Sequence, residues 1–227
     1  MNRELDVYHS ALSLELGSQP LYLHYGLIYE NNSIFQSQQL STDLIIEHLI
    51  EGQNLLEVGG GVGYTAKQLS DIGYKVTSID KRSYSNSSNV IIEDFNTMTL
   101  NSDYYDIILF QESAQYFEND FETLFNKCYN ALKFKGQLLV LDEFSTDFLN
   151  FCPISFHNAI DLTERAAPSV DFLINIIKKH KEALLKHFSE EELAQLLSEL
   201  NYRKLQYETN KYKYMLIDIR KENKWIY

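Results

Sequence analysis

The segment LLEVGGGVGYTAKQL at residues 55–69 constrains the fold more than any other part of the chain. The apolar run at 55–58 is typical of a buried strand, and the glycines that follow it allow a tight turn. Residues 65–73 have the apolar spacing of a helix that ends at Gly73. A strand, a glycine-rich turn and a helix in this order predict an α/β fold with a ligand site at the turn.

Further strands are expected after this first unit. The ranges 74–80, 90–94, 104–111 and 137–144 are nearly continuous runs of aliphatic and β-branched residues, as in strands that are buried on both faces. A helix with apolar positions three and four residues apart is expected at 119–133. This alternation predicts a Rossmann-like, doubly wound, mostly parallel sheet with helices on both faces.

The remaining segments are expected to extend this core within a single domain. Residues 1–50 predict an N-terminal helical cap, with two helices separated by an aromatic loop, ahead of a cofactor-binding core at 51–144. Residues 145–187 have a mostly helical pattern with no clear strand, and we interpret them as a helical lid. Residues 188–227 are expected to form a final helix and a hairpin.

The expected C-terminal hairpin follows a helix that Ser189 caps. The runs YRKLQYE at 202–208 and KYKYMLIDIR at 211–220 read as two antiparallel strands joined at Thr209 and Asn210. Together with the five preceding strands they predict a seven-stranded sheet.

Composition limits the compartment and the class of partner. The net charge of −12 repels phosphate backbones, which argues against nucleic acid. No apolar stretch approaches the roughly 20 residues of a membrane span, and the first ten residues do not resemble a signal peptide. We therefore expect a cytoplasmic monomer or homodimer that does not bind a membrane. The two cysteines, Cys128 and Cys152, predict neither a disulfide framework nor a metal site.

The residues that end the strands indicate the ligand, because ligands of open parallel sheets bind beyond the carboxyl ends of the strands. Glu57 lies at the end of the first strand, and Gly59, Gly61 and Gly63 follow it. Glycines there let the backbone approach a ligand closely, while the next helix points its N-terminus into the site. Asp80 ends the second strand about 20 residues later, at the distance expected for a carboxylate that holds a ribose.

A third strand end adds an adenine site. The carboxylate of Asp94 can accept a hydrogen bond from the adenine amino group while the ring of Phe95 packs on the adenine face. Lys81, directly after the ribose carboxylate, and Gln111, at the end of the fourth strand, complete the predicted cofactor-binding set.

At these residues the chain resembles the class I S-adenosylmethionine-dependent methyltransferases. Their first motif, an acidic residue followed by G-x-G-x-G, is matched at 57–63, and the resemblance covers nearly the whole chain. It implies S-adenosylmethionine as cofactor, with the glycine loop along the methionine moiety, Asp80 on the ribose and Asp94 on the adenine. The segments at 131–144 and 188–200 resemble the family's entry to the fifth strand and its helix before the final hairpin.

The leading segment LYLHYG at 21–26 resembles a stretch found in small-molecule methyltransferases of the ubiquinone-biosynthesis and sterol groups. A tyrosine in that stretch commonly closes over the cofactor, which implies this role for Tyr25. The tryptophan of the family stretch is absent here, because Leu27, Ile28 and Tyr29 follow the glycine.

Methyl transfer is an in-line displacement, and an oxygen or nitrogen acceptor must also lose a proton. His157, in the expected lid, and Glu112, just after the fourth strand, are the candidate catalytic residues, and His24 is a third possibility. Each also has a structural interpretation: His157 as a lid histidine and Glu112 as a carboxylate that caps the segment after it.

Aromatic residues in the leading segment and the lid favour a small, apolar or aromatic acceptor. These residues are Tyr22, Tyr25, Tyr29, Phe35, Phe148, Phe151, Phe156 and Phe172.

Two alternative functions remain open. Gly61-x-Gly63-x-x-Ala66 with Asp80 also fits the dinucleotide fingerprint of an NAD-dependent oxidoreductase, although the acidic residue before the glycines and Asp94 argue against it. A non-methylating S-adenosylmethionine binder, either cyclase-like or regulatory, would share the fold and the cofactor motifs.

Overall fold

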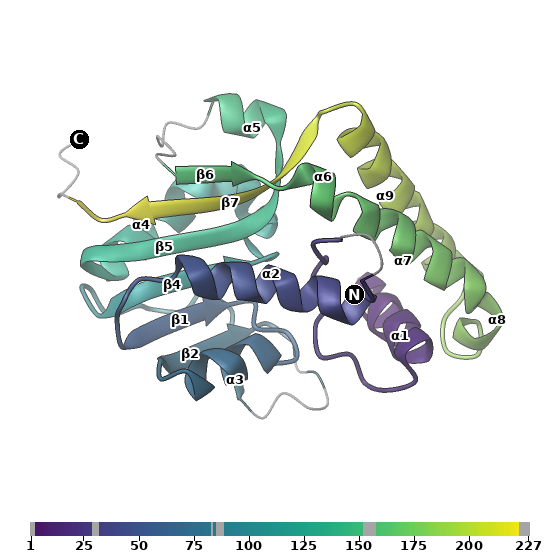
Figure 1. Cartoon of the computed structure of the whole chain (residues 1–227), viewed down its shortest axis with the longest axis horizontal. Coiled ribbons are helices and arrows are strands. Elements are labelled where there is room, and N and C mark those ends of the chain that lie inside the picture. The colour runs from purple at the N-terminus through teal and green to yellow at the C-terminus, as the bar shows by residue number, and fades with distance from the viewer. Residues whose placement is uncertain (1–2, 29–31, 83, 85–88, 152–157, 223–227) are drawn as a thin grey trace.

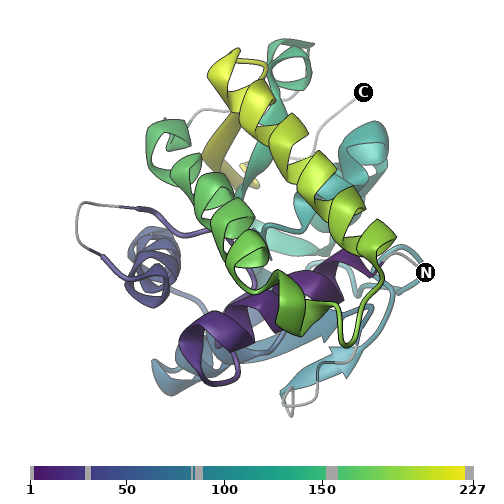
Figure 2. The same cartoon turned by 90° about the vertical axis from the view of Figure 1, so that its right-hand side faces the viewer.

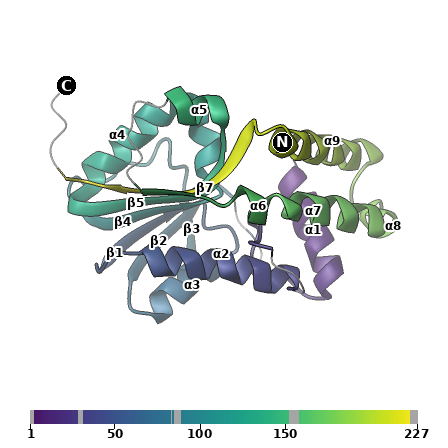
Figure 3. The ribbon, with the colours of Figure 1, turned by 45° about the horizontal axis from the view of Figure 1, so that its top comes forward.

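The structure is a computed structural model that describes residues 3–28, 32–82, 84, 89–151 and 158–222. Within these residues a seven-stranded sheet has the order β3-β2-β1-β4-β5-β7-β6, with helices on both faces (Figures 1 and 3). The strands are β1 (Asn54–Val58), β2 (Lys75–Asp80), β3 (Val90–Ile92), β4 (Tyr105–Gln111), β5 (Leu132–Ser145), β6 (Asn158–Asp161) and β7 (Tyr212–Arg220). The helices are α1 (Glu4–Leu16), α2 (Ile34–His48), α3 (Tyr64–Asp71), the 3-10 helix η1 (Ala114–Asp120), α4 (Phe121–Ala131), α5 (Thr146–Phe151), α6 (Thr163–Ala166), α7 (Pro168–Lys179), α8 (Lys181–Leu184) and α9 (Glu190–Glu208).

The sheet is parallel except at its C-terminal edge. Strands β3, β2, β1, β4 and β5 run parallel, whereas β7 lies antiparallel between β5 and β6. The strand order reverses between β1 and β4, and in folds of this kind the ligand crevice opens at that point. The predicted Rossmann-like fold is confirmed.

Alternating strand residues build two apolar layers, one on each face of the sheet. Leu55 and Ile107 belong to a cluster that includes residues of α2 and α3, whereas Leu56 and Ile108 belong to a cluster with α4. Cys128 of α4 is fully buried in the second cluster. Both faces are therefore covered, which explains why the strands read as continuous apolar runs.

Helices α1, α7, α8 and α9 pack against one another beyond one end of the sheet (Figures 1 and 2). We call these four helices the cap. Helix α9 begins with a capping box, in which Ser189 Oγ accepts from Glu192 N at 3.1 Å and Glu192 Oε2 accepts from Ser189 N at 2.7 Å. None of the described helices is long and apolar enough to cross a membrane.

Two details of the expected C-terminal region are wrong. Residues 202–208 are the last turns of α9, because the helical spacing of Leu193, Leu196 and Leu200 continues through Arg203 and Tyr207. The antiparallel partner of β7 at the sheet edge is instead β6, in the lid segment where no strand was expected. Strand β6 is exposed and only four residues long, so it carries no apolar pattern that the sequence could reveal.

Candidate functional site

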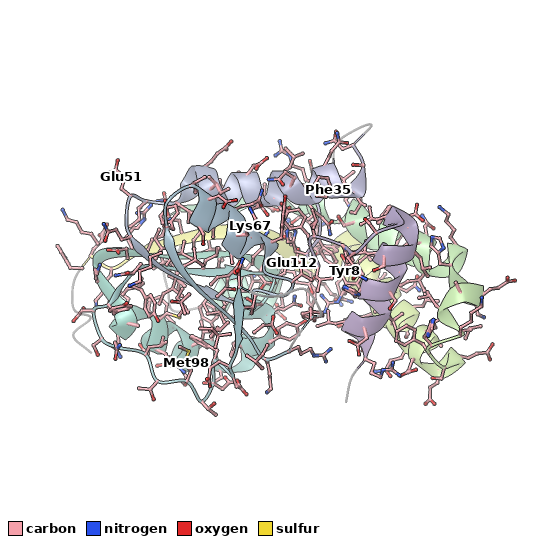
Figure 4. All side chains as sticks on the ribbon, turned by 90° about the horizontal axis from the view of Figure 1, so that it is seen from below. Tyr8, Phe35, Glu51, Lys67, Met98 and Glu112 are labelled. Atoms are coloured by element: carbon pink, nitrogen blue, oxygen red, sulfur yellow. The ribbon has the colours of Figure 1, made fainter. Side chains whose placement is uncertain are left out.

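A cavity of about 580 Å³ lies between the carboxyl ends of the strands and the cap. Its sheet side contains the glycine loop after β1 and the residues that follow β2, β3 and β4. Its cap side combines the largely apolar residues Leu5, Tyr8, Leu173, Ile177, Leu196 and Leu200 with the charged residues Glu4, Glu199 and Arg203. Figure 4 labels Tyr8 of α1 and Glu112, the first residue after β4, which lie at this junction of cap and sheet.

The glycine loop presents bare backbone to the cavity. Gly61 has φ +53°, and a Cβ placed there would meet only Leu23 Cδ1, at 3.8 Å. A Cβ on Gly59, where φ is +81°, would come within 2.4 Å of Ser113 Cβ. The first glycine therefore allows β1 and the β4 loop to pack closely, whereas Gly61 faces open space.

Glu57, which precedes the glycine loop, is almost fully buried. Its Oε2 accepts a hydrogen bond from Ser78 Oγ at 2.5 Å. Burial raises the pKa of Glu57 to about 7, the Ser78 hydrogen bond opposes this rise, and the nearby carboxylate of Asp80 adds to it. Gly60 packs against this pair, because a Cβ there would lie 1.9 Å from Ser78 Oγ.

Asp80, at the end of β2, is oriented by two backbone donors. Gly61 N donates to its Oδ2 at 2.9 Å, and Arg82 N donates to its Oδ1 at 2.8 Å. The carboxylate lines the cavity beside the glycine loop. This arrangement fixes a hydrogen-bond acceptor where the sequence predicts the ribose site.

Asp94 and Phe95 follow β3 and line the same end of the cavity. Lys81 Nζ lies 2.8 Å from Asp94 Oδ2, and this hydrogen bond, together with the backbone N–H of Asn96, lowers the pKa of Asp94. Lys127 of α4 donates to the carbonyl oxygen of Phe95, and its ammonium lies 4.5 Å from the centre of the Phe95 ring. The loop after β3 is thus held by two lysines.

Gln111 and His24 line the cavity and belong to one hydrogen-bonded chain. Gln111 accepts from Thr65 Oγ1 at 3.1 Å and donates to Thr42 Oγ1 at 3.4 Å. His24 Nε2 contacts the same threonine at 3.5 Å, and its Nδ1 bonds the carbonyl oxygen of Tyr25 at 2.8 Å. Burial lowers the pKa of His24 to about 4. With both nitrogens engaged, this imidazole is poorly placed to accept a substrate proton.

Glu112 has an unusual backbone and two strong donors. Its φ is +53°, and its Oε1 accepts from Tyr25 N and from Tyr214 Oη, each at 2.6 Å. Burial raises its pKa to about 8, while the Tyr214 hydrogen bond opposes this rise and the charge of Asp142 adds to it. Both donors use Oε1, so neither of these hydrogen bonds occupies Oε2, and the residue lines the cavity.

A polar cluster adjoins Glu112 at the end of β5. Asp142 is fully buried and accepts from the backbone N–H groups of Ala114 and Gln115, at 2.6 and 3.0 Å. Burial raises the pKa of Asp142 to about 7. Glu143, which is 4% exposed, pairs with Arg203 of α9 and accepts from Tyr207 Oη at 2.9 Å.

The structure brings most of the sequence-predicted site residues to one cavity. The lining includes Tyr25, Glu57, Gly59, Gly61, Asp80, Lys81, Asp94, Phe95, Gln111 and Glu112. Gly63 lies outside the lining and precedes α3, where a Cβ would come within 2.9 Å of Val90 Cγ2. His157 lies outside the described residues.

The expected aromatic acceptor pocket needs correction. Tyr22 and Tyr25 line the cavity, but Phe35, Phe148 and Phe172 do not. Phe148 stacks on Phe144 on the far face of the sheet, and Phe172 packs against the larger apolar cluster. The described phenylalanines of the leading segment and the expected lid, Phe35, Phe148 and Phe172, therefore lie outside the cavity. Tyr29, Phe156 and the side chain of Phe151 are outside the described part of the chain.

Sequence reasoning missed the cluster around Arg203. Asp142 and Glu143 lie near the carboxyl end of the fifth strand, so an inspection of strand ends like the one that selected Asp80 could have found them. Arg203 and Tyr207 were hidden because their segment was read as a strand, and Tyr214 contacts Glu112 from 102 residues further along the chain.

Comparisons with known proteins identify the family. The family described as a methyltransferase domain matches residues 35–207, and no curated protein matches the chain. Similar solved structures include a protein assigned as a sarcosine dimethylglycine methyltransferase from Galdieria sulphuraria, with 13% identity and a TM-score of 0.75 over 94% of this chain and 98% of the other. The (4+2)-cyclase SpnF has 15% identity and a TM-score of 0.79, covering 97% and 94% of the two chains.

The cyclopropane synthase MmaA2 from Mycobacterium tuberculosis has 13% identity and a TM-score of 0.71, again covering 97% of this chain and 94% of the other. At such identities, likeness to a solved structure shows the fold. The family match spans more than half of the chain, in agreement with the glycine motif and the strand order. The chain therefore belongs to the methyltransferase domain family, and it is an enzyme that uses S-adenosylmethionine.

Proposed function

We propose that the protein transfers the methyl group of S-adenosylmethionine to a small organic acceptor held on the cap side of the cavity. The observation that carries this proposal is the continuity of the site. One cavity is lined at its sheet side by the glycine loop and strand-end carboxylates, and at its cap side by apolar residues of α1, α7 and α9. A cofactor on the sheet side and an acceptor on the cap side would therefore meet without intervening protein.

The residues on the sheet side fit the cofactor. The bare backbone at Gly61 suits the methionine moiety, and Asp80 is oriented to accept from the ribose hydroxyls. Asp94 offers its carboxylate to the adenine amino group, and the Phe95 ring lies beside it as a packing surface. The loop that carries Tyr25 lines the cavity, which supports the closing role that small-molecule methyltransferases imply for this tyrosine.

The cap side favours an acceptor with an apolar body and a polar group. Leu173, Ile177, Leu196 and Leu200 provide apolar walls. Polar groups lie around Glu112 at the strand ends and, on the cap helices, at Glu4, Glu199 and Arg203. A small, apolar or aromatic metabolite whose methylated atom lies beside Glu112 suits this arrangement.

Bound S-adenosylmethionine supplies an electrophilic methyl group on a sulfonium, which the acceptor displaces in line. Glu112 is the group that we assign to take the proton of an oxygen or nitrogen acceptor, at Oε2. Its raised pKa makes it a strong base once ionised, and a positive charge in the adjoining half of the cavity would lower that pKa and favour ionisation. The apolar walls exclude water from this transfer.

The test combines binding with turnover. We expect S-adenosylhomocysteine to bind tightly in calorimetry and NAD not to bind. With labelled S-adenosylmethionine and a panel of small aromatic and aliphatic alcohols, amines and acids, we expect label transfer to at least one acceptor. The matched control is Asp80→Asn, which keeps the side-chain volume but removes the charge that holds the ribose.

The alternative of a cyclase-like or regulatory binder predicts a different outcome. Such a protein would bind S-adenosylhomocysteine as tightly but would release none of it from S-adenosylmethionine with any acceptor. That result would overturn methyl transfer as the function while leaving the cofactor assignment intact.

A further inference from the structure

Arg203 joins elements that surround the cavity. It projects from α9 and pairs with Glu143 at the end of β5. Its Nη1 also donates to Gln115 Oε1 of η1 at 3.1 Å. Its positive charge lies close enough to the Tyr25 hydroxyl, in the loop between α1 and α2, to oppose the rise that burial causes in the pKa of Tyr25. One guanidinium thus links the cap to the sheet and to the segment after Glu112, and it lies near the Tyr25 side chain.

The pair with Glu143 is fixed more firmly than a surface ion pair. The Glu143 side chain is 4% exposed and that of Arg203 is 28% exposed. Tyr207 lies one helical turn after Arg203 and donates to the other carboxylate oxygen of Glu143 at 2.9 Å. Residues from two successive turns of α9 therefore bind one carboxylate, which fixes the position and the rotation of this helix relative to the strand ends.

The same guanidinium sits next to the reaction centre. Arg203 lines the cavity together with Tyr25 and Glu112. The Tyr25 backbone N–H donates to Glu112 Oε1 at 2.6 Å. Glu112 therefore holds the main chain of a residue whose side chain lies near the arginine. A planar group with five donors can hold several acceptors in fixed directions, which a lysine cannot do.

We propose that Arg203 is a positioning residue for methyl transfer, which fixes the Tyr25 side chain and the α9 wall relative to Glu112 so that the acceptor is held in line. This inference rests on the proposed function and deepens it. It requires no contact between Arg203 and the acceptor, because the arginine acts through Tyr25 and α9.

The test must separate positioning from the plain stability of a buried ion pair. Arg203→Met alone would leave Glu143 buried without its cation, so the variant of choice is Arg203→Met with Glu143→Gln. The glutamine keeps an acceptor for Tyr207 and removes the uncompensated charge. The matched control is Lys204→Met, which removes the neighbouring ion pair of α9 with Asp171, at 2.6 Å, outside the cavity.

We expect the double variant to fold and to bind S-adenosylhomocysteine with an affinity within about threefold of wild type. Its kcat should fall by about 10²-fold with little change in the KM for the acceptor. A fall in kcat of this size is expected when the reacting groups are misplaced by about 1 Å. Arg203→Lys should restore only part of that loss, because charge alone does not orient Tyr25. Lys204→Met should match wild type. A kcat of the double variant within threefold of the control, or a rise confined to the acceptor KM, would overturn the proposal.

A readout without an acceptor keeps this inference separate from the proposed function. Amide hydrogen exchange in residues 21–28 should accelerate at least tenfold in the double variant and remain unchanged in Lys204→Met. Unchanged exchange at 21–28 would refute positioning of Tyr25. A wild-type protein that transfers no methyl group would instead refute the proposed function, whatever the exchange result.

Discussion

Two adjacent glycines of the loop should respond differently to substitution by alanine, one through stability and the other through cofactor binding. A Cβ on Gly60 would lie 1.9 Å from Ser78 Oγ and 2.9 Å from Glu57 Oε2. A Cβ on Gly61 would meet only Leu23, at 3.8 Å, although the φ of +53° is unfavourable for alanine. We therefore expect Gly60→Ala to reduce stability and Gly61→Ala to reduce cofactor affinity.

The magnitudes follow from these contacts. In Gly60→Ala, Ser78 must rotate away from Glu57, which leaves a buried carboxyl group without its donor at a cost of about 1–3 kcal/mol. Residual crowding adds about 1–3 kcal/mol, so the total of roughly 2–5 kcal/mol is a large share of a typical free energy of unfolding. Gly61→Ala should cost about 1–2 kcal/mol of backbone strain and should raise the Kd for S-adenosylhomocysteine, because its methyl group projects into the cavity.

The loss in Gly60→Ala should depend on pH. The pKa of Glu57 in the folded protein, about 7, lies above its usual value, so its contribution to stability is fully present below that usual value and is lost as pH rises through 7. Removing the Ser78 hydrogen bond raises this pKa further, which makes the variant's deficit larger at pH 8 than at pH 6. Urea unfolding at both pH values, with calorimetric titration of both variants, measures these effects. A Gly60→Ala variant within about 0.5 kcal/mol of wild type at pH 8 would refute this reasoning.

Three further outcomes are expected. Because Glu112 has a pKa of about 8 in the free protein, kcat/KM for the cofactor should fall about tenfold per pH unit below pH 8. Glu112→Gln should lower kcat by about 10²-fold or more and abolish this fall at low pH. An unchanged pH profile would eliminate Glu112 as the base. Asp80→Asn should raise the Kd for S-adenosylhomocysteine by about 10–100-fold in calorimetry, the loss expected for hydrogen bonds to a charged group, and a change below threefold would contradict its ribose role. Lys81→Met should leave the urea midpoint unchanged, because the lysine side chain is 74% exposed in its pair with Asp94, and a marked shift would show that this pair is structural.

The fold and the cofactor side of the cavity were predictable because they depend on local rules. Parallel strands place their carboxyl ends at one edge, so Glu57, Asp80 and Asp94 could be assembled from strand ends alone. The glycines in the sequence indicate where the backbone takes a conformation that other residues rarely adopt, since φ is positive at Gly59 and Gly61.

The cap side was less predictable because its contacts join distant parts of the chain. Glu112 receives one donor from Tyr25, 87 residues earlier, and another from Tyr214, 102 residues later. The sequence around Arg203 gives no sign that it pairs with Glu143. Apolar and polar residues alternate in this segment enough to resemble a strand. Strand β6 lacks an apolar pattern altogether, so only its pairing with β7 defines it.

A crystal structure of the protein with S-adenosylhomocysteine tests the central claim most directly. We expect the ribose hydroxyls on Asp80, the adenine beside Asp94 and Phe95, and the sulfur directed toward the half of the cavity that Glu112 and Tyr8 line. Sulfur directed away from that half, or a ribose that does not reach Asp80, would contradict a cavity that joins cofactor and acceptor for methyl transfer.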